Sequence, residues 1–339
     1  MHRAGRNALV QSEPHRPRQG CGEQVKVVKT ALSRPRGLIA VDKMGGKVIF
    51  LDPVSYATVC VLDDFSRVPH ELLVIPRASI ACVPIFGDGI HGRNPNPGHL
   101  LSIVDLELRQ HVFDIDLSPY CAPHGLQEGP DGLVYVTCEN SGVVALVDLD
   151  RRAVVDVIET GSTNAHRLTI ATGGQRLYTE NEEDASISVI DVPSRLLIRQ
   201  VPMPHPLAGL AISPDGKLLV AVDDQEPMLF VIETATLEIV KRLPLADVPE
   251  PGQIARYSPD GLLLLVTSMR SNTATLIDAS FIHQRTVAVG RQPMDGAFCG
   301  DELLVACQGD GTIHSIDLNA RQVSRPFAAG IGCETVAFF

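Results

Sequence analysis

Hydrophobic positions along the chain occur in short runs that alternate with turn residues, and this pattern repeats. Five segments join a turn rich in Gly, Pro or Asp to a β-rich run: LSRPRGLIAVDKM, EGPDGLVYVTCEN, ATGGQRLYTENEE, ISPDGKLLVAVDD and YSPDGLLLLVTSM. A second short run follows and ends in an acid, in VIFLD, LSIVD, VALVD, ISVID, LFVIE, ATLID and IHSID. Seven such units, about 40 residues apart, are typical of a repeat protein whose units are stable only when packed on their neighbours.

The repeat predicts an all-β fold, a seven-bladed β-propeller of four-stranded antiparallel blades. Since one blade cannot bury both of its faces, the blades must close into a ring. The C-terminal segment CETVAFF has the pattern of an innermost strand and is favoured to complete the first blade, because joining the chain ends removes an exposed strand edge. The alternative is VVKTALS, near Val27. Residues 1–24 are expected to form a disordered, basic lead, and residues 25–339 the propeller.

Two of the repeats resemble a known family. The segments PHGLQEGPDGLVYVT and GLAISPDGKLLVAV are similar to the YVTN-type propeller repeat, and the resemblance extends over nearly the whole chain from about Lys29. It implies the same propeller fold. It leaves the activity open, because YVTN-type propellers include enzymes, electron-transfer modules and scaffolds. Some of them hydrolyse or open cyclic esters, so the resemblance implies a lactonase or lyase as one activity to consider.

When the turns are aligned, one position of each unit falls at the start of the innermost strand. Its occupants are Glu334, His70, His124, His166, Ala208, Gln253 and Met294. Innermost strands surround the central channel, so side chains from three adjacent blades are expected to converge at its mouth. Imidazole and carboxylate groups bind Fe, Cu, Mn or Zn, and such a site can keep an open position for catalysis. We therefore predict one divalent transition metal ion with His70, His124, His166 and Glu334 as ligands.

Acidic residues are expected at the same face, because the second strand of each blade runs back toward it. Glu139, Glu180 and Asp223 stand at the ends of these strands, and Asp42 has a similar place in the first blade. They are suited to accept the second imidazole N–H of a metal ligand or to move protons in catalysis. The alternative is structural, since Asp and Asn at this place often cap a turn through its own backbone. The acids that end the seven shorter runs recur in every unit and are interpreted as turn formers.

The second unit departs from the repeat by an insertion on this same face, within VPIFGDGIHGRNPNPGH. Long insertions in compact folds are usually functional, and the Gly and Pro residues give this loop a defined shape. We expect it to cover the channel mouth and to bring His91, Arg93 and His99 to a substrate. Arg93 is suited to bind a carboxylate.

Several residues near the predicted site also have plain structural interpretations. A single histidine at a strand start is usually a hydrogen-bonding turn residue, and only its recurrence in three successive blades favours a metal. Cys121 and Cys333 lie close in sequence to predicted ligands, but small buried thiols are the simpler interpretation. His205, in MPHPLAG, is interpreted as a loop residue, and the roles of Met294 and Asp295 stay open.

Composition and charge narrow the class of protein. The chain is 45% hydrophobic and 20% charged, as in soluble globular proteins. Its net charge is -11, and seven of its 29 Lys and Arg residues lie within residues 1–35, so the body is acidic and disfavours nucleic acid. No run approaches the ~18 apolar residues of a membrane span, and the N-terminus has charges where a signal peptide is apolar. We expect a cytoplasmic protein with no membrane contact, whose eight cysteines are reduced.

Three functions follow from these observations. The first is a metal-dependent enzyme that acts on a small organic molecule at the channel mouth. It is expected to be an oxygenase or oxidase with Fe or Cu, and a lyase, isomerase or hydrolase with Zn or Mn. The second is a metal-free lactonase or lyase in which a histidine acts as base. The third is a non-catalytic scaffold for an unknown protein partner, which the absence of Trp and the 4% aromatic content disfavour.

Overall fold

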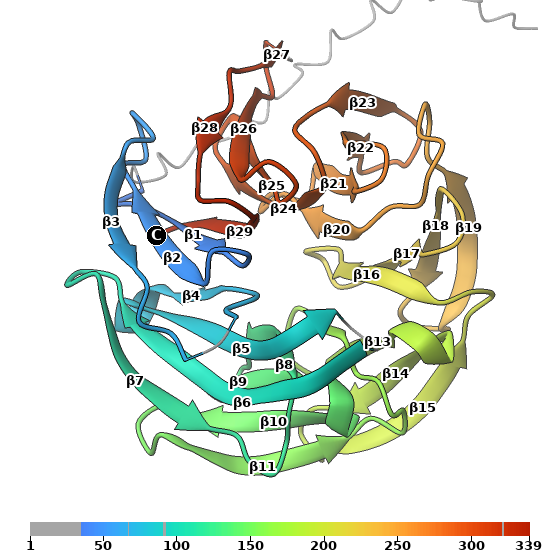
Figure 1. The fold of residues 1–339 in the computed structure, drawn as a ribbon. Coiled ribbons are helices and arrows are strands. Elements are labelled where there is room, and N and C mark those ends of the chain that lie inside the picture. Colours follow the sequence, from blue (N-terminus) through green and yellow to red (C-terminus); the bar gives the residue numbers. More distant parts are fainter. Residues whose placement is uncertain (1–34, 67, 91–92, 321) are drawn as a thin grey trace, which may run out of the picture. The chain divides into compact units, whose positions relative to one another are not determined.

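The computed structural model describes residues 35–339 apart from residues 67, 91, 92 and 321. These residues form seven antiparallel blades around a central axis, so the predicted seven-bladed β-propeller is confirmed (Figure 1). The predicted lead, residues 1–24, and its boundary lie outside the described residues. The helices within the described residues are single turns, and none has the length or hydropathy of a transmembrane segment.

Each of the first four blades is built, from its innermost strand outward, of four strands. Blade 1 contains β29 (Cys333–Phe338), β1 (Leu38–Asp42), β2 (Lys47–Leu51) and β3 (Thr58–Leu62). Blade 2 contains β4 (Leu73–Ile75), β5 (Ile80–Ile90), β6 (Arg93–Asp105) and β7 (Gln110–Asp116). Blade 3 contains β8 (Pro123–Glu128), β9 (Val134–Cys138), β10 (Val143–Asp148) and β11 (Ala153–Glu159). Blade 4 contains β12 (Arg167–Ile170), β13 (Arg176–Asn181), β14 (Ser186–Asp191) and β15 (Leu196–Pro202).

The last three blades follow the same order. Blade 5 contains β16 (Leu207–Ile212), β17 (Leu218–Asp223), β18 (Met228–Glu233) and β19 (Glu238–Pro244). Blade 6 contains β20 (Ile254–Tyr257), β21 (Leu263–Ser268), β22 (Thr273–Asp278) and β23 (Gln284–Ala288). Blade 7 contains β24 (Pro293–Cys299), β25 (Glu302–Cys307), β26 (Thr312–Asp317) and two short outer strands, β27 (Gln322–Val323) and β28 (Phe327–Ala328). Three single-turn 3-10 helices are η1 (Pro76–Ala78), η2 (Glu139–Ser141) and η3 (Glu182–Asp184).

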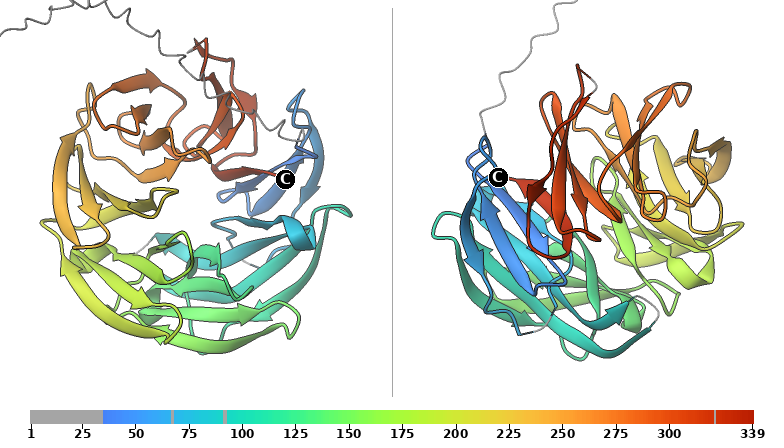
Figure 2. Two further views of the ribbon diagram at one scale, coloured as in Figure 1. Left: turned by 180° about the vertical axis from the view of Figure 1, so that it is seen from behind. Right: turned by 45° about the horizontal axis from the view of Figure 1, so that its top comes forward.

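The C-terminal strand closes the ring, as favoured from the sequence. β29 pairs antiparallel with β1, with Leu38 opposite Phe338 and Ala40 opposite Val336. Figure 2 shows this strand beside the first blade from two further sides. The alternative segment VVKTALS lies outside the described residues. Closure by the far end of the chain leaves blade 1 with no unpaired inner edge, which is the physical reason for favouring it.

The core is divided among the contacts between neighbouring blades. One cluster of buried side chains fills each of the seven interfaces. In β1, Leu38 and Ala40 face blade 7, whereas Ile39 and Val41 face blade 2. Both faces of the strand are therefore buried, which explains why its sequence is a continuous apolar run instead of an alternating one.

The acids that end the third strands are turn formers, as the sequence indicated. Asp105 accepts hydrogen bonds from the backbone N–H groups of Glu107 and Leu108. Asp148 does the same for Asp150 and Arg151 in the next blade. A short carboxylate that caps its own turn in this way is a local device needed once per blade, so these residues are independent of any single site.

Candidate metal centre

The starts of the innermost strands converge on one cavity at a mouth of the central channel. The cavity has a volume of about 330 Å³, and it is lined by six of the aligned positions: Glu334, His70, His124, His166, Gln253 and Met294. Ala208, the seventh aligned position, is not among the described residues that line the cavity. One backbone hydrogen bond to the second strand recurs, from His70 N–H to Pro84 O and from His166 N–H to Glu180 O. Because every blade has the same geometry, residues that are regularly spaced in the sequence lie close together at the channel mouth.

A second ring of residues surrounds the same cavity, and most of it was not predicted from the sequence. Each of its members directly follows the second strand of its blade, and those that line the cavity are Lys43, Glu182, Asp224, Met269 and Gln308. Glu139 has this position in blade 3. The repeat does mark these positions in the sequence. Asp224 lies one residue beyond the predicted Asp223, and Glu182 lies two residues beyond the predicted Glu180. A shift of one residue along a strand turns a side chain to the opposite face, so Asp224 faces the cavity and Asp223 does not.

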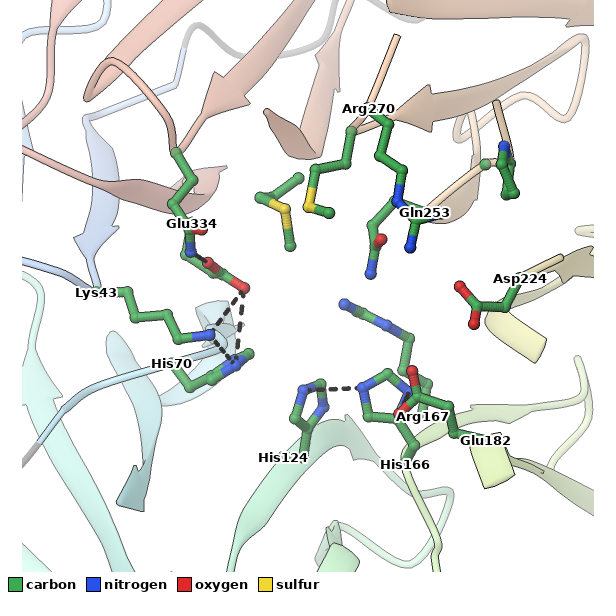
Figure 3. Close-up of a pocket in the computed structure, with 15 residues that line it drawn as sticks. Lys43, His70, His124, His166, Arg167, Glu182, Asp224, Gln253, Arg270 and Glu334 are labelled. Carbon is green, nitrogen blue, oxygen red and sulfur yellow. Dashed lines mark hydrogen bonds and ion pairs between the residues drawn. The ribbon is translucent and has the colours of Figure 1, made fainter. Parts of the chain in front are cut away.

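The three predicted histidines lie in contact with one another (Figure 3). The ring centroids of His70 and His124 are 4.4 Å apart, and those of His124 and His166 are 4.1 Å apart. The Nε2 atoms of His124 and His166 face each other at 3.1 Å. All three rings are buried, with at most 5% of any residue exposed. The predicted convergence of these imidazoles at the axis is therefore what the structure contains.

Glu180 orients His166. Its carboxylate accepts a hydrogen bond from Nδ1 of His166, and both groups are buried. Because Nδ1 carries the proton in this pair, Nε2 of His166 presents its lone pair toward His124. Glu182 lies on the same side, with Oε2 3.7 Å from Nδ1 of His166. Glu180 thus lies where a carboxylate that supports a ligand was expected from the sequence.

His70 and Glu334 form a separate group around a lysine that was not predicted from the sequence. The ammonium of Lys43 lies 2.6 Å from Nε2 of His70 and 3.5 Å from Oε1 of Glu334. Gln308 also donates to Glu334. An ammonium that donates to Nε2 uses the lone pair with which His70 would bind a metal. The four predicted ligands are therefore divided in this structure into a His124–His166 pair and a Lys43–His70–Glu334 group.

A buried ion pair lies one layer deeper in the channel. Nη1 of Arg167 donates to Oε1 of Glu71 at 2.7 Å, and the same oxygen is 4.0 Å from Nδ1 of His124. Burial raises the pKa of Glu71, and the charge of Arg167 opposes this shift. Gly125 allows the approach of Arg167, because a Cβ at residue 125 would lie 3.2 Å from the Cα of Arg167. In the sequence, Glu71 directly follows His70 and Arg167 directly follows His166. This adjacency could have identified them as residues near the site.

Carboxylates complete two donor groups that share His124. The potential ligand atoms of His124, Glu139 and His166 all lie within 4.8 Å of one another, and so do those of His70, Glu71 and His124. In the second group, Arg167 already supplies a positive charge to Glu71. The first group therefore has the better arrangement for a metal cation.

Two predicted acids lie elsewhere. Asp223 accepts a hydrogen bond from Nδ1 of His205 at 2.8 Å, and its other oxygen accepts the backbone N–H groups of Gln225 and Glu226. Asp42 accepts the N–H groups of Gly45, Ile331 and Gly332. Both are turn caps. Their neighbours Asp224 and Lys43 face the cavity instead.

The insertion of blade 2 is a long β-hairpin made by the ends of β5 and β6. His91 lies outside the described residues, and the side chain of Arg93 is likewise outside the description. Asn94 and Pro95 border a separate cavity of about 660 Å³, together with Glu139 and Asn164. His99 contacts Asp116 at 3.0 Å in an exposed position. In its described part, the hairpin therefore borders the neighbouring cavity and does not line the one that contains the histidines.

The buried state of His124 leads to a prediction about pH. Burial, followed by the neighbouring His166 and His70, lowers the pKa of His124 well below the usual value of 6.5. The imidazole is therefore neutral at pH 7 in the folded protein. The unfolded chain binds a proton near pH 6.5 that the folded chain does not, so the free energy of unfolding must fall as pH drops through 6.5.

The expected loss from this one group is about 1.4 kcal/mol per pH unit below pH 6.5. Denaturant unfolding of the metal-free protein between pH 7.5 and 5 measures it. His124→Gln has no titrating group at this place. The slope of its free energy of unfolding against pH should therefore be smaller by the contribution of one proton. Equal slopes in the two proteins would show that His124 is protonated normally.

Comparisons with known proteins agree with this fold. The propeller of Kuenenia stuttgartiensis hydrazine synthase aligns with a TM-score of 0.69 at 17% identity, over 91% of this chain and 99% of that chain. At this identity the likeness concerns the fold alone. A search of curated proteins by sequence found no match. The YVTN-type family is not identified by these comparisons, whereas the family profile described as cytochrome D1 heme domain matches residues 128–302. That match spans just over half of the residues, and the chain belongs to the cytochrome D1 heme domain family.

Proposed function

We propose that the protein is a metal-dependent enzyme in which one divalent transition metal ion is bound by His124 and His166 at the channel mouth. One observation carries this proposal. Nε2 of His124 and Nε2 of His166 face each other at 3.1 Å. Two nitrogens bound to one ion at about 2.0–2.1 Å lie roughly 3.0–3.4 Å apart. The protein therefore holds the two imidazoles at the spacing of two ligands.

The protonation pattern supports the same assignment. His166 donates Nδ1–H to Glu180, which leaves its Nε2 available. His124 is neutral at pH 7, and with an ion at Nε2 its proton would move to Nδ1, which faces Glu71 at 4.0 Å. Nδ1 of His124 has no hydrogen-bond partner among the described residues, so it can carry this proton. His166 thus has a carboxylate hydrogen-bonded to its far nitrogen, as metal-bound histidines commonly do, and Glu71 lies 4.0 Å from the far nitrogen of His124.

Glu139 is the third proposed ligand. Its carboxylate lies within 4.8 Å of the donor atoms of both histidines. Two histidines and one carboxylate leave coordination positions open, an arrangement typical of non-haem Fe(II) sites. We propose that His70 and Lys43 lie beside these open positions and exchange protons with a substrate there. When bound, Fe or Cu supplies redox chemistry, and Zn or Mn supplies Lewis-acid activation of a small organic molecule or of water.

The family name raises haem as a cofactor, and His124 and His166 do not fit as the two axial ligands of one haem iron. A haem iron leaves the protein only two positions, on opposite faces of the macrocycle and roughly 4 Å apart at bond lengths of about 2 Å. The Nε2 atoms of His124 and His166 are 3.1 Å apart, with ring centroids at 4.1 Å, so no macrocycle fits between them.

The metal-free enzyme remains the second candidate because of one observation. His166 and Glu180 form a buried histidine–carboxylate pair, which is also how a general base is oriented in hydrolytic enzymes. In that case Nε2 of His166 would take a proton from a substrate or from water.

Metal content decides between these functions. The protein is to be expressed in media supplemented separately with Fe, Cu, Mn and Zn, dialysed, and measured by elemental analysis and absorption spectroscopy. We expect close to one ion per chain for one of these metals, and no porphyrin absorption band. No retained metal under any of the four conditions would leave the metal-free enzyme. A stoichiometric porphyrin spectrum would overturn the argument against haem.

A further inference from the structure

The cavity at the channel mouth has two unlike sides. His124, His166 and Glu182 occupy one side, and Figure 3 shows Arg270 and Gln253 on the other, with Asp224 beside Gln253. Met269 and Met294 also line the cavity. Thioether side chains are apolar and adapt their shape to a ligand, whereas a guanidinium binds oxyanions. The side away from the histidines therefore combines an apolar surface and the positive charge of Arg270 with one acidic group, Asp224.

A second cavity adjoins the first on this side. Met269 and Arg270 line both, and the second has a volume of about 390 Å³. Its other described lining residues are Asn272, Arg291, Gln292 and Gly309. These lining residues of the described chain include two guanidinium groups and no Asp or Glu. A positive pocket of this kind is a local exception in a chain whose net charge is -11.

Neither guanidinium is neutralised by a close carboxylate. Arg270 has one ion-pair contact among the described residues, to Glu250 at 3.9 Å, with both side chains largely exposed. A contact of this length and exposure contributes little. Arg291 has no ion pair with any described residue. Two exposed guanidiniums beside one pocket can each bind an oxyanion through paired hydrogen bonds.

We propose that the substrate is an organic anion whose carboxylate or phosphate group is bound by Arg270 and Arg291. This rests on the proposed function for its other end, which lies at His124 and His166. Arg270 and Arg291 fix the direction in which the substrate lies, because the cations on the histidine side are already paired, Lys43 with Glu334 and Arg167 with Glu71. Met269, which lines both cavities, contacts the part of the molecule between its two ends.

The experiment is an anion titration of protein made metal-free by dialysis against a chelator. Inorganic phosphate and succinate are added at constant ionic strength, with chloride as the reference, and binding is followed by calorimetry and by the melting temperature. Arg270→Gln and Arg291→Gln are each expected to weaken binding about tenfold, since a hydrogen bond to a charged group contributes that much. Arg270→Lys should bind the anion with an intermediate affinity, because it keeps the positive charge but loses the paired N–H donors of the guanidinium.

Arg199→Gln is the matched control, because it removes the same charge from β15, the outermost strand of blade 4, and should bind as the unmodified protein does. Stronger binding of phosphate than of succinate indicates a phosphate ester, and the reverse indicates a carboxylate. The proposal is overturned if neither anion binds better than chloride, or if the Arg270 and Arg291 variants bind normally. Since the titration uses metal-free protein, its failure is distinct from absence of metal in the elemental analysis.

Discussion

Replacing His124 with alanine is expected to abolish binding of the proposed metal ion. His124 is the central ring of the three, and it belongs to both donor groups of the channel mouth. Removing a residue that only supports a metal ligand typically weakens binding roughly 10–100-fold, so loss of a ligand should weaken it by at least about 100-fold. Elemental analysis of the dialysed variant, expressed with the metal that the unmodified protein retains, measures this loss. The same variant is expected to lose the proposed enzymatic activity.

His283→Ala is the matched control, because this histidine is exposed and precedes β23, outside the residues that line the cavity. It should retain the metal in full. Circular dichroism must show that His124→Ala is folded, since truncating a buried ring leaves a cavity. A folded His124→Ala protein with undiminished metal would contradict the assignment of the ligand.

A chain that ends at Gly332 is expected to lose cooperative folding. The deletion removes β29, which pairs with β1 along Leu38, Ile39, Ala40 and Val41. It exposes the edge of β1 and uncovers fully buried side chains, each of which contributes about 1.5–3 kcal/mol by burial. A folded domain is stable by only about 5–15 kcal/mol, so the loss of several such contacts exceeds what the remaining strands retain. Thermal melting followed by circular dichroism measures the effect.

Glu334→Gln is the control for this deletion. It changes a group that faces the cavity and leaves every backbone hydrogen bond of β29 in place. We expect it to melt cooperatively, close to the unmodified protein. If the shortened chain also melts cooperatively at the same temperature, another segment must complete the first blade.

Part of the candidate site could be predicted from spacing alone. The inner-strand position recurs once per unit, and the backbone hydrogen bonds of the blade place it in the same way each time, as for His70 and His166. Glu180 was predicted for a similar reason, because the second strand returns to the same face. Such residues need only local geometry and the repeat, both of which are written in the chain.

The contacts between blades could not be predicted in this way. Lys43 lies beside His70 although 27 positions separate them in the sequence. Its ammonium contacts Nε2 of His70, the nitrogen with which His70 would bind a metal. Arg167 pairs with Glu71 from a blade two positions away around the ring. Long side chains reach across such gaps in several rotamers, and only the packed neighbours select one. For this reason the predicted set of four ligands was divided by the structure.

By itself, the sequence determined the number of blades and the three histidines at the axis, because both depend on a period along one chain, and it favoured the C-terminal strand as the one that closes the ring. Only the tertiary structure decided which imidazole nitrogen meets which partner, where Asp223 and Asp224 point, and which of two adjoining cavities is positive. Those outcomes depend on a residue's register to within one position and on charges contributed by distant blades. A periodic pattern contains neither.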